Sequence, residues 1–276
     1  MSRIQKKFEE LKRVGRTALV PYITAGDPQP NATVEIMHLL VKKGADMLEL
    51  GVPFSDPMAD GPVIQRAVER ALTHNVSLMD VLEFVRVFRE KDTETPVALM
   101  GYLNPVEAMG YEDFAQAAVS AGLDGVLTVD MPPEESAGYL EALKKHDLDR
   151  IFLVSPTTPA SRLDAVNEKG SGFVYYVSLK GVTGSKELDT VDVANNMARL
   201  RTKLNIPIGI GFGINDGSMA YEMAKLGDAV VVGSALVRLI EANAPKGMDD
   251  VCLALGEKMT ELRQAIDKAD ALKGQE

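Results

Sequence analysis

Short, nearly continuous runs of apolar and β-branched residues recur along the chain and are its main structural signal. Runs of this kind, rather than strict alternation, are typical of parallel strands that are covered on both faces. Successive runs begin on average about thirty residues apart, which is the length of a strand with its crossover helix. The predicted strands are residues 18–24, 47–52, 97–102, 125–130, 151–155, 173–178, 206–211 and 229–234.

Stretches with helical periodicity lie between the predicted strands. The first of them stops at Gly44, a residue type that commonly ends helices. Another opens with Glu134 and Glu135, acids that the helix dipole favours in a first turn. Helices are predicted at residues 32–43, 111–121, 134–146 and 218–226, with two more outside the repeat at 2–14 and 248–268.

This alternation in a chain of 276 residues predicts an α/β fold, a (β/α)₈ TIM barrel with extra N- and C-terminal helices. We expect residues 1–276 to form a single domain. An open, doubly wound parallel sheet is the alternative. The interval between the second and third strands is the longest, and its extra length begins with the loop 53–62. A loop that lengthens a connection in this way is often functional.

Composition and charge narrow the range of partners. Lys and Arg number 30 against 40 Asp and Glu, and this net charge of −10 argues against binding to nucleic acid or an anionic membrane. The chain has neither the apolar segment of a membrane span nor that of a signal peptide. The lone cysteine, Cys252, cannot form an internal disulfide, which favours a reducing compartment. We therefore expect a cytoplasmic protein.

Active sites of such barrels lie at the carboxyl ends of the strands, and two candidate catalytic carboxylates lie in the second predicted strand and in the loop after it. Glu49 lies within an apolar run, where burial would raise its pKa and prepare it as a proton carrier. A salt-bridged core carboxylate is the alternative, although no cationic partner is evident on the neighbouring strands. Asp60 ends the long loop and could equally cap the next helix. Asp56 and Asp130 are expected to fix loops.

Glycine turns close the last two predicted strands, at residues 209–214 and at Gly233-Ser234. Glycine lets backbone N–H groups approach a ligand, and a helix after the eighth strand would point its positive end at the same place. These loops form the common phosphate site of such barrels, and close packing at a barrel corner is the alternative. The glycine-containing segment 178–186 suits either a mobile lid or a plain surface loop.

Two kinds of site are not indicated. His38, His74 and His146 fall on predicted helices or at their ends, so no histidine-ligated metal is expected. No glycine fingerprint for a dinucleotide opens a helix. The phosphate is therefore expected to belong to the substrate.

Six segments carry a family resemblance: residues 21–28, 48–62, 100–105, 181–184, 211–214 and 233–234. Together they resemble the α subunit of tryptophan synthase over essentially the whole chain, and segment 48–62 is long and highly specific. The resemblance implies a lyase that splits indole-3-glycerol phosphate into indole and glyceraldehyde 3-phosphate in a retro-aldol reaction. It also implies an α₂β₂ heterotetramer, in which the β subunit receives the indole. That subunit carries pyridoxal phosphate, and no cofactor is implied on this chain.

The resemblance also implies roles for individual residues. Glu49 would deliver a proton to indole C3 and take one from the glycerol hydroxyl, and Asp60 would accept the indole N–H. Tyr175 and Thr183 would orient these carboxylates and close the lid. Residues implied at the phosphate are Gly184, Gly211, Gly213, Gly233 and Ser234. Candidate walls of the indole pocket are Tyr22, Ile64, Leu99, Met100, Leu127 and Phe212.

Two other functions stay open at this point. A Schiff-base aldolase would use Lys180, although its glycine-rich surroundings do not favour a desolvated lysine. A non-catalytic barrel would bind phosphate and only activate a partner, although the presence of both Glu49 and Asp60 argues against it. Docking of the β subunit is predicted at the loops 53–60, 102–109 and 131–136.

Overall fold

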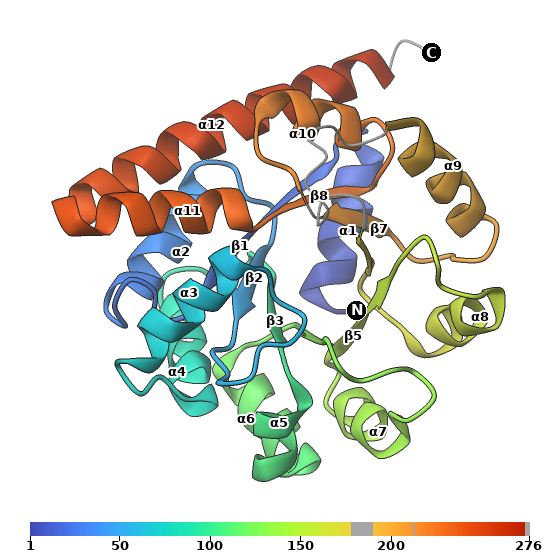
Figure 1. The fold of residues 1–276 in the computed structure, drawn as a ribbon. Helices are drawn as coiled ribbons and strands as arrows, with labels where there is room; N and C mark the ends of the chain where they lie inside the picture. The colour runs from blue at the N-terminus through green and yellow to red at the C-terminus, as the bar shows by residue number, and fades with distance from the viewer. Residues whose placement is uncertain (178–189, 212, 274–276) are drawn as a thin grey trace.

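The strands form a closed barrel in the computed structural model, which describes residues 1–177, 190–211 and 213–273 (Figure 1). All neighbouring strands are parallel and follow chain order, and the last strand pairs with the first. The barrel prediction is therefore confirmed, and the open-sheet alternative is wrong. The strands are β1 (Ala18–Thr24), β2 (Leu48–Gly51), β3 (Val97–Gly101), β4 (Gly125–Thr128), β5 (Asp149–Val154), β6 (Val174–Val177), β7 (Ile208–Gly211) and β8 (Ala229–Val232).

Helices surround the barrel, and the six helices predicted from the sequence are all present, with ends within about five residues of their predicted positions. None of the described helices has the length and hydropathy of a membrane span. The helices are α1 (Arg3–Arg13), α2 (Ala32–Lys42), α3 (Pro62–Leu72), α4 (Leu78–Arg89), α5 (Leu103–Met109), α6 (Tyr111–Ala121), α7 (Ala137–Lys145), α8 (Ala160–Lys169), α9 (Thr190–Arg201), α10 (Gly217–Ala224), α11 (Ser234–Asn243), the 3₁₀ turn η2 (Ala244–Lys246) and α12 (Met248–Lys273).

Two segments differ from the sequence prediction. Helix α7 begins at Ala137 rather than at residue 134, because the carbonyl of Pro133 accepts hydrogen bonds from Ser136 Oγ at 3.0 Å and Lys169 Nζ at 2.6 Å. That carbonyl is thus held outside the helix. The segment predicted as a loop at 102–109 is mostly the short helix α5, whose first N–H donates to Asp130 Oδ1 at 2.8 Å. Asp130 therefore fixes this connection, as expected.

Side chains of each strand alternate between the barrel interior and the layer of helices, as the strand period requires. On β3, Ala98 packs inside the barrel with Leu127 of β4, whereas Leu99 packs in the outer core beneath the helices. Neighbours on a strand point to opposite faces, so Leu99 and Met100 cannot both line an interior pocket. Met100 lies on the interior side, and the prediction of Leu99 as a pocket wall is wrong.

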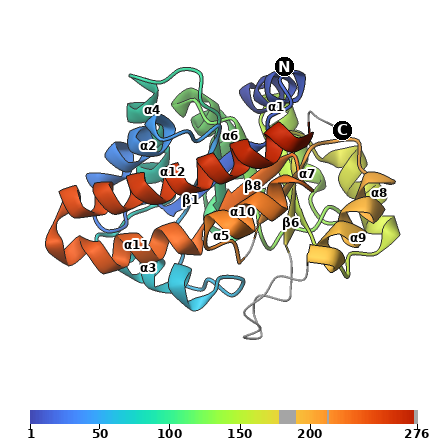
Figure 2. The same cartoon turned by 90° about the horizontal axis from the view of Figure 1, so that it is seen from above.

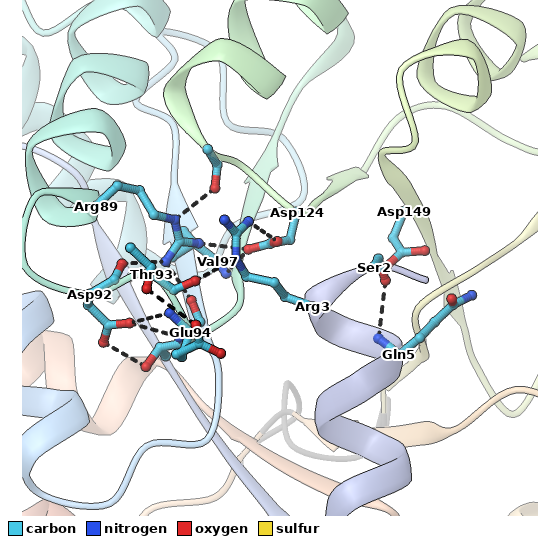
Figure 3. Close-up of polar contacts among 12 residues, drawn as sticks. Ser2, Arg3, Gln5, Arg89, Asp92, Thr93, Glu94, Val97, Asp124 and Asp149 are labelled. Atoms are coloured by element: carbon cyan, nitrogen blue, oxygen red, sulfur yellow. Dashed lines mark hydrogen bonds and ion pairs between the residues drawn. The ribbon is translucent and has the colours of Figure 1, made fainter.

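Helix α1 closes the amino-terminal end of the barrel. Its apolar face, with Ile4 and Phe8, packs against interior residues at the amino-terminal ends of the strands. Figure 3 shows the polar contacts that anchor it: Arg3 Nη1 lies 2.8 Å from Asp124 Oδ1, and the Ser2 hydroxyl donates to Asp149. In Figure 2, α1 lies at one end of the barrel and α3 at the other. Access to the interior is therefore from the carboxyl ends of the strands.

Candidate active site

Glu49 lies on the inner face of β2 and is 1% exposed. Its backbone is in register with Tyr22 of β1 and Ala98 of β3, and neither residue carries a positive charge. Neither carboxylate oxygen has a hydrogen-bond partner among the described residues, so the salt-bridged alternative finds no support in that part of the chain. Burial raises the pKa of Glu49 to about 8. Near neutral pH this carboxyl can therefore act both as an acid and as a base.

Asp60 is half-buried in the loop after β2 and is held by Tyr102, the residue that follows β3. The Tyr102 hydroxyl donates to Asp60 Oδ2 at 3.0 Å and accepts the Ala59 N–H at 3.0 Å. Burial raises the pKa of Asp60, while the Tyr102 hydrogen bond acts in the opposite direction. The helix-capping alternative is not observed, because the N-cap of α3 is Gly61 and no described side chain caps it.

Tyr102 is a site residue that the sequence reasoning missed. Its position was a usable signal, because it follows a barrel strand at the carboxyl end and lies within the segment 100–105 that carries the family resemblance. Its ring also packs against Phe54, with the ring centroids 5.3 Å apart. Tyr102 thereby joins the end of β3 to the loop that carries Asp60.

Two tyrosines on the inner face of the barrel lie against glycines of the adjacent strand. A Cβ at Gly51 would lie 2.1 Å from Tyr22 Oη, and one at Gly211 would lie 2.2 Å from Tyr175 Oη. Burial, followed by the negative charge of Glu49, raises the pKa of Tyr175 well above its usual value. The charge of Glu49 therefore acts on Tyr175 across the barrel interior, and glycine at 211 is required by the close packing of Tyr175.

The other predicted phosphate residues gather where β7 and β8 end. Gly213 follows β7 with a φ of +77°, Gly233 is the N-cap of α11, and Ser234 is the first residue of that helix. No described side chain caps α11, so its first-turn N–H groups can meet an anion there. The arrangement suits a phosphate group. Four predicted site residues, Lys180, Thr183, Gly184 and Phe212, lie outside the described residues.

The predicted indole walls fall into two groups. Tyr22, Ile64 and Met100 pack together, with Ala67 and Val237, at the open end of the barrel. Leu127 belongs to the cluster deeper inside the barrel. Side chains from β1, β3 and α3 therefore form an apolar surface at this end of the barrel.

Comparison with known proteins identifies the family. A family model described as "Tryptophan synthase alpha chain" matches residues 8–267. The chain belongs to the tryptophan synthase alpha chain family. A curated tryptophan synthase alpha chain from Hydrogenovibrio crunogenus is 67% identical over 270 residues, covering 98% of this chain and 99% of that protein. Another, from Thioalkalivibrio sulfidiphilus, is 55% identical, with 97% and 100% covered.

Solved structures of tryptophan synthase alpha chains have the same fold. The alpha subunit from Legionella pneumophila str. Paris aligns with a TM-score of 0.92 at 50% identity, covering 97% of this chain and 99% of that one. The aminoacrylate-bound tryptophan synthase of M. tuberculosis aligns with a TM-score of 0.85 at 34% identity, covering 96% and 100%. The tryptophan synthase alpha chain family is a lyase family of tryptophan biosynthesis. We therefore retain neither the Schiff-base aldolase nor the non-catalytic barrel.

Proposed function

We propose that Glu49 and Asp60 carry the lyase reaction of this chain, the retro-aldol cleavage of indole-3-glycerol phosphate. Protonated Glu49 delivers its proton to indole C3, and the ionised carboxylate then takes the proton of the adjacent glycerol hydroxyl. The carbon–carbon bond breaks, a carbonyl forms, and the bonding electrons return to the ring. The observation that carries the proposal is the burial of Glu49 without a described partner, which raises its pKa to about 8.

Asp60 acts on the other side of the ring in this proposal. Its carboxylate accepts the indole N–H and stabilises the positive charge that develops on the ring after protonation. Tyr102 keeps the carboxylate in place through the 3.0 Å hydrogen bond. Tyr175 and Thr183 orient the catalytic groups, while Tyr22, Ile64 and Met100 hold the indole on their apolar surface.

The substrate phosphate is bound at the ends of β7 and β8. Backbone N–H groups around Gly184, Gly211, Gly213, Gly233 and Ser234 hold it, supported by the N-terminus of α11. Such a site explains how a chain with a net charge of −10 binds an anion.

A β subunit receives the indole in an α₂β₂ complex, and pyridoxal phosphate belongs to that subunit. We place its docking at this end of the barrel, where the loop 53–60 exposes Met58. We place the chain, as a single domain, in the cytoplasm, in keeping with its lone Cys252.

The direct test is indole release from indole-3-glycerol phosphate by the purified chain. Glu49→Gln should lose at least about 10²-fold in kcat, because the amide can neither give nor take the proton. Glu83→Gln is the matched control, since Glu83 is an exposed residue paired with Arg86 on α4. Full activity in Glu49→Gln would remove Glu49 from the mechanism.

A further inference from the structure

Ionised Glu49 needs a hydrogen-bond donor, and no described residue donates to it in the present structure. A carboxylate that loses its proton inside an apolar barrel is costly unless a donor reaches it. Among the described residues, the titratable groups on which the charge of Glu49 acts are Tyr22 from β1 and Tyr175 from β6, and the negative charge of Asp60 also acts on Tyr22. Both tyrosines can donate, whereas Asp60 cannot when ionised.

Tyr22 is placed to donate to Glu49. The two residues are in register on adjacent parallel strands, so their side chains leave the same face of the sheet. The Tyr22 ring leans over β2, with its oxygen above Gly51, and Gly51 lies two residues beyond Glu49 on the same face. The hydroxyl therefore lies between Glu49 and the open end, on the side from which substrate arrives.

The Tyr22 hydroxyl is weakly held in its present position. Its hydrogen-bond partner among the described residues is the buried hydroxyl of Thr24, at 3.3 Å. Hydrogen bonds between hydroxyl oxygens are usually about 2.5–3.0 Å long, so this contact is a poor one. A carboxylate is a much stronger acceptor than a threonine hydroxyl. Neither Glu49 oxygen has a partner within hydrogen-bond distance among the described residues, so the Glu49 or Tyr22 side chain must move for the hydroxyl to reach the charged carboxylate.

We propose that Tyr22 is a positioning residue whose hydroxyl donates a hydrogen bond to Glu49 after that carboxyl has given its proton to the substrate. When Glu49 is protonated again, the hydroxyl returns to Thr24. This inference rests on the proposed function, in which Glu49 alternates between its two forms. It gives Tyr22 a polar role in addition to the apolar wall that its ring provides.

Tyr22→Phe tests this proposal, because it keeps the ring and removes the hydroxyl. Tyr139→Phe is the matched control: Tyr139 is also buried and pairs with a threonine, Thr128, at 3.0 Å, but in the outer core. The readout is a ¹³C NMR titration of chains labelled at the glutamate carboxyl, without substrate, in which Glu49→Gln identifies the Glu49 signal. Loss of a donor to the ionised form should raise the Glu49 midpoint by about one pH unit in Tyr22→Phe. Tyr139→Phe should leave it unchanged.

Steady-state kinetics distinguish a hydroxyl that positions Glu49 from a ring that only lines the indole site. With the hydroxyl donating to Glu49, Tyr22→Phe lowers kcat about tenfold, the effect of one charge-assisted hydrogen bond, and changes KM less than about twofold. An unchanged Glu49 midpoint, or a raised KM with kcat intact, would overturn the proposal. The titration needs no turnover, so its failure is distinct from failure of the proposed function, which indole release by Glu49→Gln tests.

Discussion

At the scale of single residues, the site depends on the surroundings of the Glu49 carboxyl, to which no described residue donates a hydrogen bond. Glu49 is 1% exposed, and its oxygens have no partner among the described residues, so burial alone raises its pKa to about 8. Asp60 differs, because Tyr102 donates to it and opposes the effect of burial. Two carboxyls of similar chemistry therefore obtain different protonation behaviour from their surroundings.

Tyr102→Phe should test the support given to Asp60. Loss of the donated hydrogen bond raises the pKa of Asp60, because that bond stabilises the ionised form. We expect kcat/KM to fall about tenfold and the acidic limb of its pH profile to move to higher pH. Tyr111→Phe is the control, since Tyr111 pairs with Glu107 at 3.5 Å on the surface. An unchanged profile in Tyr102→Phe would show that the hydroxyl does not influence Asp60 during catalysis.

At the scale of elements, the periodicity of apolar residues predicts the residue range of each strand, but it does not predict which side chains face the same pocket. The strand positions were predicted closely, because continuous apolar runs are a strong local signal. Leu99 was misplaced because the facing of a strand is decided by its register with β2 and β4, which the sequence alone does not state. The start of α7 was wrong because tertiary hydrogen bonds hold the Pro133 carbonyl. Tyr102 was missed because its partner Asp60 is 42 residues away along the chain.

Asp124 is one of two buried carboxylates, with Asp149, that anchor α1 at the end of the barrel. Asp124 binds Arg3 at 2.8 Å and Arg89 at 2.7 Å, and it also accepts the Val97 N–H (Figure 3). Asp124→Asn leaves two guanidinium groups without their anion and should lower the free energy of unfolding by about 3 kcal/mol, measured by urea denaturation.

Asp164→Asn is the control for this change. It removes an exposed ion pair with Lys203 and should cost less than about 1 kcal/mol. Equal stabilities of the two variants would contradict the anchoring role of Asp124.

At the scale of the whole molecule, α1 closes the amino-terminal end of the barrel, and the candidate active site lies at the opposite end. Family membership, the fold and the burial of Glu49 in the second strand could be predicted, because the segment 48–62 is both specific and at a strand end. Burying Glu49 with no partner among the described residues also affects the stability of the whole chain. Folding holds its proton at pH values where the unfolded chain releases it.

The sign of this linkage gives a prediction for stability. The folded pKa of Glu49 is about 8, above the usual 4.5, so its contribution to the free energy of unfolding decreases as pH rises from about 4.5 to 8. Glu49→Gln cannot ionise, so this decrease in the free energy of unfolding is absent in the variant. Between these pH values the parent should lose stability relative to the variant by roughly 1.4 kcal/mol per pH unit at most, measured by urea denaturation. Parallel pH profiles would indicate that Glu49 is ionised in the folded chain.

The central claim is that Glu49 holds its proton near neutral pH, and its ¹³C carboxyl titration in the parent chain tests this most directly. The measurement needs neither substrate nor the β subunit, and Glu49→Gln assigns the signal. The account predicts a midpoint well above 4.5, shifted toward the value of about 8 that burial alone produces. A midpoint near 4.5, the usual value for a glutamate, would contradict it.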